Sequence, residues 1–433
     1  MPKDKVVVGI DLGTSKVATI IATCPSDEPV NVIGVSSVPS RGLRKGQVVD
    51  IDEAVEVISQ SLEEAERMAG YSVGSAFVSV GGSHITSENS RGVVAVAEPE
   101  KEISPNDIDR VIEAAKAISL PSSREILHVL PRGYIVDGQE GIKDPVGMTG
   151  IRLEAEAHII SSSATAARNL GKCLDKVGVD IESLVFGGLA SAEAVLSETE
   201  KELGVVLVDI GGGTTDVCLY TEGALAYSSV LPVGAKNITS DLAIGLRVSL
   251  ESAEKIKLFL GEKPKFAVLP EEEKLREEER PTKEEKEVDL RSLGLTENLD
   301  RVSQKTLTEG IIKPRLNEIF TMVGLEIKKS GFGGLTPSGV VITGGGAETV
   351  GMLEAAKRML AMPIRKGTPA GMTGLIDEIQ TPVFSTAVGL TIFGRKSEFL
   401  EKKTPFIGFP KIGPLPIKGA VKKAVDFIKS FLP

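Results

Sequence analysis

The sequence predicts an α/β protein that contains two related domains. One observation is a repeated plan of apolar strand, acidic Gly/Thr turn and second apolar strand, found around residues 11–16 (DLGTSK) and again around residues 209–216 (DIGGGTTD). A second observation is that helical patterns, such as residues 53–68, alternate with strands. A third is the length of 433 residues, which exceeds what one ordinary core accommodates. The repeated plan indicates an internal duplication in which each domain presents a similar hairpin.

The composition excludes several classes of protein. The hydrophobic fraction of 41% and charged fraction of 25% are ordinary for a soluble globular chain, and the net charge of −10 argues against general binding to nucleic acid. Cys24, Cys173 and Cys218 lie far apart, so we expect neither a metal cluster nor a disulfide framework, and a reducing cytosol fits. The first residues contain no signal-peptide stretch, and no apolar run could span a bilayer. We therefore expect a protein that is neither exported nor transmembrane.

The two Gly/Thr turns have the chemistry of phosphate-binding loops. Backbone N–H groups of a glycine-rich turn can converge on phosphate oxygens because no side chain blocks the approach. Carboxylates would repel phosphate directly, but they fit if Mg²⁺, held through water, lies between them and the phosphates. Either turn alone could be a simple tight hairpin, whereas the pair favours a phosphate site. The candidate phosphate ligands are Gly13, Thr14, Ser15, Lys16, Gly211, Gly212, Gly213, Thr214 and Thr215, and the candidate metal ligands are Asp11 and Asp209.

Two further stretches could hold a base and ribose. Residues 340–347 (VVITGGGA) predict a strand and a glycine turn before a helix, without the full dinucleotide-binding motif. The stretch AEKIK places Glu254 and Lys257 one helical turn apart on one face, which suits ribose hydroxyls and the base, although such a pair is more often a surface salt bridge. The candidate residues of the glycine turn are Gly344, Gly345, Gly346 and Ala347.

These four stretches, in this order, resemble the two phosphate loops, the connecting helix and the adenosine loop of the actin, hexokinase and Hsp70 superfamily. Within it, the stretches GGSHITSENSRGVV, GLASAEAVLSETEKELGVVLVDIGGGTTDV, NITSDLA and GVVITGGGAETVGM are similar to the FtsA family of bacterial cell-division proteins. The resemblance covers almost the whole chain. It implies a two-lobed actin-like (ribonuclease H-like) ATPase fold that binds ATP and Mg²⁺ and carries the inserted subdomain 1C of that family.

The patterns and the resemblance together predict the domain organisation. Residues 84–159 show a self-contained pattern of strand, helix and strand, while residues 271–287 are rich in glutamate and lysine and are expected to form a solvated loop or exposed helix. The expected order is subdomain 1A in 1–83, the inserted 1C in 84–159, 1A again in 160–203, 2A in 204–250, 2B with the charged loop in 251–335, a return through 2A and 1A in 336–395, a proline-rich linker in 396–418 and a terminal helix in 419–433.

The terminal segment GAVKKAVDFIKSFLP has the pattern of a helix that lies on a membrane surface. Its apolar residues fall on one continuous helical face, and its lysines lie off that face. From Lys411 onward the side chains carry five lysines and one aspartate, a local net charge of +4 that an anionic lipid surface would attract. The alternative is a helix docked on the protein's own core. The face consists of Val421, Ala424, Val425, Ile428, Phe431 and Leu432.

The resemblance also implies a function. It suggests a peripheral protein at the cytoplasmic face of the cell membrane that self-associates into filaments, tethers FtsZ filaments at the division site and recruits later divisome membrane proteins through subdomain 1C. The helix predicted at 310–321 matches the docking helix of the family for the FtsZ C-terminal tail, and Arg315, Asn317 and Glu318 are its candidate contacts. These charged residues could instead form only the solvated face of the helix.

Two alternatives share the predicted fold. One is a small-molecule kinase, for which Asp216 is the candidate general base by its sequence distance from the phosphate turns. The other is an actin-like adaptor of pilus assembly. For the division protein we expect at most a slow ATPase, because the best match to the catalytic glutamate of the chaperone relatives is Gly188, which has no side chain to position water.

Overall fold

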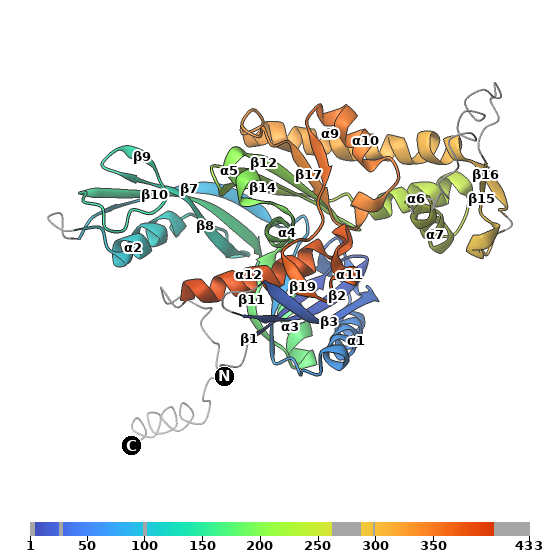
Figure 1. The fold of residues 1–433 in the computed structure, drawn as a ribbon, viewed down its shortest axis with the longest axis horizontal. Helices are drawn as coiled ribbons and strands as arrows, with labels where there is room; N and C mark the ends of the chain where they lie inside the picture. The colour runs from blue at the N-terminus through green and yellow to red at the C-terminus, as the bar shows by residue number, and fades with distance from the viewer. Residues whose placement is uncertain (1–4, 26–28, 98–101, 262–286, 298, 402–433) are drawn as a thin grey trace, which may run out of the picture. The chain divides into compact units, whose positions relative to one another are not determined.

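The computed structural model describes residues 5–25, 29–97, 102–261, 287–297 and 299–401. Residues 1–395 and residues 396–433 form two separate compact units. The first unit contains two lobes, each built on its own β-sheet, and an inserted subdomain (Figure 1). Most of the charged block at 271–287, the linker beyond residue 401 and the predicted membrane helix at 419–433 lie outside the described residues, including Val421, Val425, Ile428, Phe431 and Leu432.

Lobe 1 is built on a six-stranded mixed sheet. Its first three strands form an antiparallel meander, and the other three pair with their neighbours in parallel, as in an α/β fold with crossover connections. In spatial order the strands are β11 (Asp180–Phe186), β6 (Ser75–Val80), β1 (Lys5–Leu12), β2 (Lys16–Cys24), β3 (Val30–Pro39) and β19 (Met372–Gly374). The helices of this lobe are α1 (Ile51–Ala69), α3 (Ala164–Val177), α4 (Gly187–Val195) and α12 (Ser385–Glu401).

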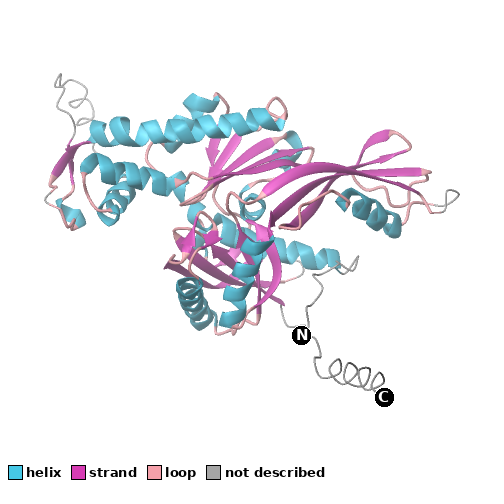
Figure 2. Ribbon diagram, turned by 180° about the vertical axis from the view of Figure 1, so that it is seen from behind, coloured by secondary structure: helices cyan, strands magenta, loops and turns pink. Residues whose placement is uncertain are grey.

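Lobe 2 repeats this plan on a five-stranded sheet. Its first three strands are again antiparallel, and two parallel strands continue the sheet, which confirms the predicted two-lobed α/β architecture. The strands in order are β14 (Ala224–Leu231), β13 (Thr215–Thr221), β12 (Val205–Ile210), β17 (Val340–Thr343) and β18 (Ile364–Lys366). Helices lie against the sheets of both lobes (Figure 2). Those of lobe 2 are α6 (Ala235–Leu246), α7 (Leu250–Gly261), α9 (Lys313–Ser330) and α10 (Met352–Leu360).

The sequence explains why these strands and helices form. Every residue of β12 and β13 is buried, and such near-continuous apolar strands are typical of a sheet that is covered on both faces. In α1, Asp50 accepts hydrogen bonds from the N–H groups of Asp52 and Glu53, and Gly70 ends the helix in the left-handed conformation with a φ of 63°. The helix predicted at 53–68 is therefore confirmed, with slightly wider bounds.

The inserted subdomain is a four-stranded antiparallel sheet with one helix. The predicted strand, helix and strand correspond to β7 (Thr86–Ala95), α2 (Pro105–Lys116) and β8 (Arg124–Val136). The sequence patterns did not predict β9 (Gln139–Ile142) or the position of β10 (Arg152–Ser163) between β7 and β8. The helix and sheet enclose a separate small hydrophobic core. The insertion is therefore a folded unit with a core of its own.

Side chains of the insertion bind the edge strand of lobe 2. Ser87 Oγ donates to the carbonyl of Ser228 at 2.6 Å, and Asn89 Nδ2 donates to the carbonyl of Ala226 at 3.1 Å. His158 connects the two sides, since Nδ1 lies 2.7 Å from Asn89 Oδ1 and Nε2 lies 2.9 Å from Ser228 Oγ. Because β14 is the edge strand of its sheet, these bonds satisfy carbonyl groups that could otherwise pair with another chain.

Short elements complete the fold. α12 continues to Glu401, into the segment expected to be a linker, because residues 396–401 contain no proline and the first proline of that stretch is Pro405. No helix in the described ranges has the length and apolar character needed to cross a membrane. The remaining elements are β4 (Leu43–Arg44), β5 (Gln47–Val48), β15 (Glu287–Asp289), β16 (Arg301–Ser303), α5 (Glu198–Leu203), α11 (Ile376–Ile379), a π-helical segment at Thr306–Ile312 and 3-10 turns at Arg291–Leu293, Gly345–Glu348 and Pro382–Phe384.

Burial of His128 makes the stability of the fold depend on pH. Its Nε2 accepts a hydrogen bond from the N–H of Phe186 at 3.0 Å, and burial lowers its pKa from 6.5 to about 4. Below pH 6.5 the unfolded chain therefore binds more protons than the folded protein, so this contribution to stability falls as the pH drops from 6.5 toward 4. We expect His128→Gln, which keeps an acceptor but does not titrate, to remove this dependence.

The measurement is urea unfolding of the wild type and of His128→Gln at pH 7, 6 and 5. Relative to the variant, the wild type should lose about 1–2 kcal/mol between pH 7 and pH 5. The other titrating groups are common to both proteins, so the difference between the two profiles reports on His128 alone. Parallel profiles would contradict the assignment.

Candidate functional site

The structure brings the Gly/Thr turns of the two lobes face to face. Each turn closes in the same way: the N–H of its first glycine donates to the carbonyl three residues later, at 3.0 Å in lobe 1 and 2.9 Å in lobe 2. A Cβ atom on Gly212 would lie 2.0 Å from Ser15 Oγ, and one on Gly213 would lie 2.9 Å from Thr14 Oγ1. Glycine is therefore required for the two turns to approach this closely. The structure thus brings the two turns that carry the predicted phosphate-binding residues into contact.

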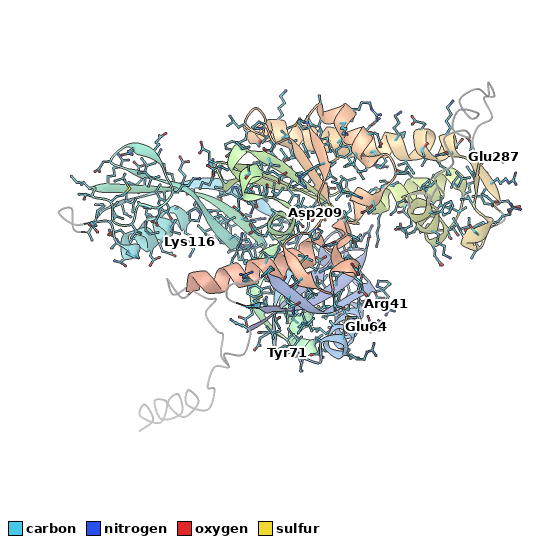
Figure 3. All side chains as sticks on the ribbon, viewed as in Figure 1. Arg41, Glu64, Tyr71, Lys116, Asp209 and Glu287 are labelled. Carbon is cyan, nitrogen blue, oxygen red and sulfur yellow. The ribbon has the colours of Figure 1, made fainter. Side chains whose placement is uncertain are left out.

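Two helices orient the carboxylate of Asp209, a residue of β12 that lies near the junction of the two lobes (Figure 3). α4 and α12 pack so closely that a Cβ atom on Gly389 would lie 1.8 Å from the carbonyl of Ala190. Ser191 of α4 donates a hydrogen bond to Asp209, and Thr386 Oγ1 of α12 donates to the same carboxylate oxygen at 3.3 Å. The sequence analysis did not identify either hydroxyl, because no local spacing connects these helices to the turn.

Three carboxylates with like charge lie close together at this point. Asp209 and Asp216 are buried, and Asp11 is half-buried. Burial raises the pKa of Asp209 to about 6, and repulsion from Asp11 adds to this shift. Burial also raises the pKa of Asp11, and burial with repulsion from the other two carboxylates raises that of Asp216. Carboxylates that resist ionisation in this way indicate a shortage of positive charge, which a divalent cation would supply.

Two buried polar atoms of the site have no hydrogen-bond partner among the described residues. They are Nζ of Lys16 and Oδ1 of Asp216. The Lys16 ammonium lies 4.3 Å from the centroid of the Phe384 ring; burial lowers its pKa, while Asp11 and Asp209 raise it. An unpaired buried charge is destabilising, so an ammonium and a carboxylate oxygen in this state point to a ligand that pairs with them.

The donor set fits Mg²⁺ held through water better than a metal held by protein ligands alone. In the parts of the chain that the structure describes, no group of three or more His, Cys, Asp or Glu side chains could hold a metal ion. Mg²⁺ usually keeps several waters and binds through one or two carboxylates and substrate phosphates. Asp11 and Asp209, beside two phosphate-type turns, fit that preference.

The two predicted nucleoside-binding segments lie next to each other and next to the second turn. Gly344 has a φ of +80°, and a Cβ atom there would lie 2.2 Å from Asp209 Oδ1, so this position requires glycine. The end of α7 meets the 344–347 turn region, because a Cβ atom on Gly261 would lie 2.5 Å from the carbonyl of Glu348. The C-terminal end of α7 therefore lies against the residue that follows the 344–347 turn.

The Glu254–Lys257 pair is not an exposed surface salt bridge. Lys257 is only 7% exposed, and its Nζ lies 2.7 Å from Glu254 Oε2 and 3.0 Å from Thr239 Oγ1. Thr239, on α6, also donates to Glu254 Oε2 at 2.6 Å. The pair therefore fixes α7 against α6, while the Glu254 side chain remains 40% exposed and can reach a ligand.

The glycine that faces the carboxylates is Gly187, one residue before the predicted match to the chaperone glutamate. A Cβ atom on Gly188 would lie 2.8 Å from Cys218 Sγ and 2.9 Å from the Phe186 ring, inside the core. A Cβ atom on Gly187 would lie 3.1 Å from Asp216 Oδ2. The sequence could not distinguish the two positions, since a pair of adjacent glycines carries no side-chain pattern. Neither position supplies a carboxylate.

The predicted partner-binding residues on α9 have partners within the chain. Arg315 forms two hydrogen bonds with Asp241 of α6, at 2.6 Å and 2.9 Å, and also pairs with Glu318 at 2.5 Å. Asn317 Oδ1 accepts a hydrogen bond from Arg358 of α10 at 2.6 Å. The helix predicted at 310–321 begins at Lys313, after the π-helical segment, and ends at Ser330. Arg315 therefore links α9 to α6 and is not simply part of a solvated face.

Comparison with known proteins identifies the family. Residues 82–161 match the model of the SHS2 domain inserted in FtsA, and residues 206–389 match the model of cell division protein FtsA. The chain is 39% identical over 396 residues to cell division protein FtsA of Pseudomonas aeruginosa, covering 91% of this chain and 90% of that protein. It is 36% identical over 400 residues to FtsA of Escherichia coli K12, covering 91% of each chain. It is 37% identical over 409 residues to FtsA of Bacillus subtilis, covering 94% and 87%.

Solved structures with low sequence identity share the fold. The PilM–PilN type IV pilus biogenesis complex matches with a TM-score of 0.61 at 16% identity, covering 90% of this chain and 98% of that chain. MreB5 of Spiroplasma citri bound to ADP matches with a TM-score of 0.51 at 13% identity, covering 94% and 100%. At these identities the likeness establishes the fold only. Together with the sequence relatives, it shows that the chain belongs to the FtsA family of bacterial cell division proteins and has the two-lobed actin-like ATPase fold with an inserted SHS2 domain.

Proposed function

We propose that this protein binds Mg²⁺ and ATP between its lobes, self-associates into filaments and tethers FtsZ filaments to the cytoplasmic face of the cell membrane at the division site. Membership of the FtsA family supports the cellular role. The observation that carries the nucleotide assignment is the meeting of two Gly/Thr turns around Asp11, Asp209 and Asp216, beside the unpartnered ammonium of Lys16.

The phosphates would lie against backbone N–H groups of the two turns other than those of Gly13 and Gly211, which close their own turns. Thr14 and Thr214 add hydroxyl groups, whereas the buried Thr215 hydroxyl donates to the carbonyl of Val233 at 2.8 Å and so faces away from the predicted phosphates. Lys16 adds an ammonium that has no hydrogen-bond partner among the described residues. Asp11 and Asp209 would hold Mg²⁺ through water; the bound ion supplies positive charge between the carboxylates and the phosphates. The base and ribose would lie against the 344–347 turn, within reach of Glu254 and Lys257 of α7.

Hydrolysis should be slow in this arrangement. Rate enhancement of phosphoryl transfer depends on positioning the attacking water, and neither Gly187 nor Gly188 has a side chain to do so. Asp216 has an unpartnered Oδ1 and is the remaining candidate, with its pKa raised by burial and by two neighbouring carboxylates. A small-molecule kinase would need such a base beside an acceptor hydroxyl, and family membership favours the division role over that alternative and over a pilus adaptor.

Partner binding is proposed at three places. The FtsZ C-terminal tail would dock on α9 at Arg315, Asn317 and Glu318, later divisome membrane proteins would bind the inserted subdomain, and anionic lipid would bind the apolar and basic face of residues 419–433. The first assignment is supported by the fixed geometry of Arg315, which Asp241 and Glu318 hold in place. The lipid assignment rests on helical periodicity and a local net charge of +4 from Lys411 onward.

Removing the Asp209 carboxylate should abolish tight binding without destabilising the protein. We expect Asp209→Ala to weaken Mg-ATP binding at least tenfold, about 1.4 kcal/mol, in calorimetric titration. Because the folded pKa of Asp209 is raised to about 6, the charged group opposes folding at pH 8, so Asp209→Asn should unfold at or above the wild-type temperature without nucleotide. The exposed Asp175→Asn is the matched control. Unchanged nucleotide affinity in both Asp209 variants would refute the metal assignment.

Charge reversal at Arg315 tests tail docking only if the internal ion pair is restored. Arg315→Asp should weaken binding of an FtsZ tail peptide. It should also lower thermal stability, because it places a carboxylate beside that of Asp241. The swap Arg315→Asp with Asp241→Arg should recover most of the stability by re-forming the pair. We expect the swap still to bind the peptide at least tenfold more weakly than the wild type in fluorescence anisotropy. Wild-type affinity in the swap would remove Arg315 from the docking site.

Deleting residues 419–433 should abolish sedimentation with anionic vesicles and leave the melting temperature unchanged. Phe431→Glu should nearly abolish sedimentation, because it places a charge on the apolar face that would enter the lipid. Ser430→Glu makes the same charge change on the opposite side of the helix and should retain most of the binding. A large drop in melting temperature on deletion would instead assign the segment to the protein core.

A further inference from the structure

Lys236, near the start of α6, is fixed to the second Gly/Thr turn by its backbone. The N–H of Lys236 donates to the carbonyl of Gly212 at 2.8 Å, and the N–H of Ala235 donates to the carbonyl of Gly211 at 2.9 Å. A Cβ atom on Gly234 would lie 2.6 Å from the Gly211 carbonyl, so this position has no room for a side chain. The first residues of α6 and the turn of lobe 2 therefore form one rigid piece.

The side chain of Lys236 crosses from lobe 2 to lobe 1. Its Nζ donates to the backbone carbonyl of Thr14, in the first Gly/Thr turn, at 2.7 Å. Thr14 is itself held in place, because its Oγ1 accepts a hydrogen bond from the N–H of Gly46 at 3.2 Å. A hydrogen bond from a charged donor is stronger than one between neutral groups. This bond therefore links the two turns directly and fixes their relative position.

The electrostatic surroundings connect Lys236 to the predicted nucleoside segment. Lys236 is solvent-exposed, so a ligand can reach it. Partial burial lowers the pKa of its ammonium, while Glu254 raises it and Lys257 lowers it. Those two residues of α7 are the predicted nucleoside contacts. An ammonium carries three donors, and the bond to Thr14 uses one of them, so two others are available to oxygen atoms of a ligand.

We propose that Lys236 is a positioning residue for the nucleotide. Its ammonium holds the phosphate turns of the two lobes in register through the bond to Thr14, and its other two N–H donors point at phosphate oxygens. The inference rests on the nucleotide site proposed above. Lys16 supplies positive charge beside the three carboxylates, and Lys236 supplies it beside the nucleoside segment. Release of the nucleotide by separation of the turns requires the bond between Lys236 Nζ and the Thr14 carbonyl to break.

The test compares Lys236→Met and Lys236→Arg with a matched control in the full-length protein. The control is Lys143→Met, which removes a lysine that pairs with Glu202 at 2.6 Å outside the predicted site. The rate of Mg-ATP release is measured by chasing a fluorescent ATP analogue with unlabelled ATP, and the affinities for Mg-ATP and adenosine are measured by titration. We expect Lys236→Met to release the analogue at least tenfold faster, with unchanged affinity for adenosine. Lys236→Arg should restore slow release in part, and Lys143→Met should match the wild type.

Release from Lys236→Met at the wild-type rate would overturn the proposal. An equal loss of affinity for ATP and adenosine would also overturn it, because that result indicates only a general structural defect.

Amide hydrogen exchange without nucleotide provides a separate readout. Residues 13–16 should exchange faster in Lys236→Met than in the wild type, and equal exchange would overturn the link between the turns. If the wild type itself binds no Mg-ATP, the proposed nucleotide site fails, whereas hydrogen exchange still decides whether Lys236 joins the lobes.

Discussion

Burial of three neighbouring carboxylates, those of Asp11, Asp209 and Asp216, is the constraint on which the rest of the site depends. Burial raises the pKa values of all three, and repulsion from neighbouring carboxylates adds to the shifts of Asp209 and Asp216. The Lys16 charge and the hydrogen bonds from Ser79 and Ser191 offset only part of that effect. Grouping three acids in poorly solvated surroundings opposes folding, so the arrangement is explained by binding and not by stability. The close packing of α4 on α12 is what keeps the hydroxyl donors in place around Asp209, because neither helix can shift without a clash at Gly389.

The two lobes repeat one backbone plan but contribute different sets of charges to the site. In lobe 1, Asp11 pairs in register with Ala18, whereas in lobe 2 the equivalent Asp209 pairs with Asp216. The closing residue of the turn is Lys16 in lobe 1 and Thr214 in lobe 2. Lobe 1 therefore supplies an acid and an ammonium from this hairpin, and lobe 2 supplies two acids and a turn with three consecutive glycines. Duplication of the hairpin explains the shape of the site, and divergence at these two positions explains why its halves are not interchangeable.

Local sequence patterns were enough to predict the turns. The other side chains of the site and the order of the strands depend on long-range packing, which the sequence alone does not show. The Gly/Thr turns and the glycine turn at 344–347 depend on short stretches whose backbone geometry requires glycine, so the sequence showed them directly. Ser191, Thr386 and Lys236 reach the site from helices of ordinary composition, and no spacing in the sequence marks them. Likewise, periodicity placed Arg315 on the surface of a helix but could not reveal that Asp241 lies opposite. The central position of β10 also depends on pairing between distant segments.

The inserted subdomain is attached to both lobes, which limits how they can move. The chain enters the insertion just before β7 and leaves it at the end of β10. Arg124 joins these two points, because its guanidinium donates to the carbonyls of His84 and Ser161, each at 2.9 Å. On the other side, the bonds of Ser87, Asn89 and His158 hold the insertion to the edge strand of lobe 2. Each such bond contributes about 0.5–1.5 kcal/mol net, so the attachment to lobe 2 is reversible, whereas the continuous chain keeps the insertion on lobe 1. A change in the angle between the lobes must therefore break the bonds to lobe 2 or turn the insertion. The position of this subdomain is thus coupled to the relative position of the two Gly/Thr turns.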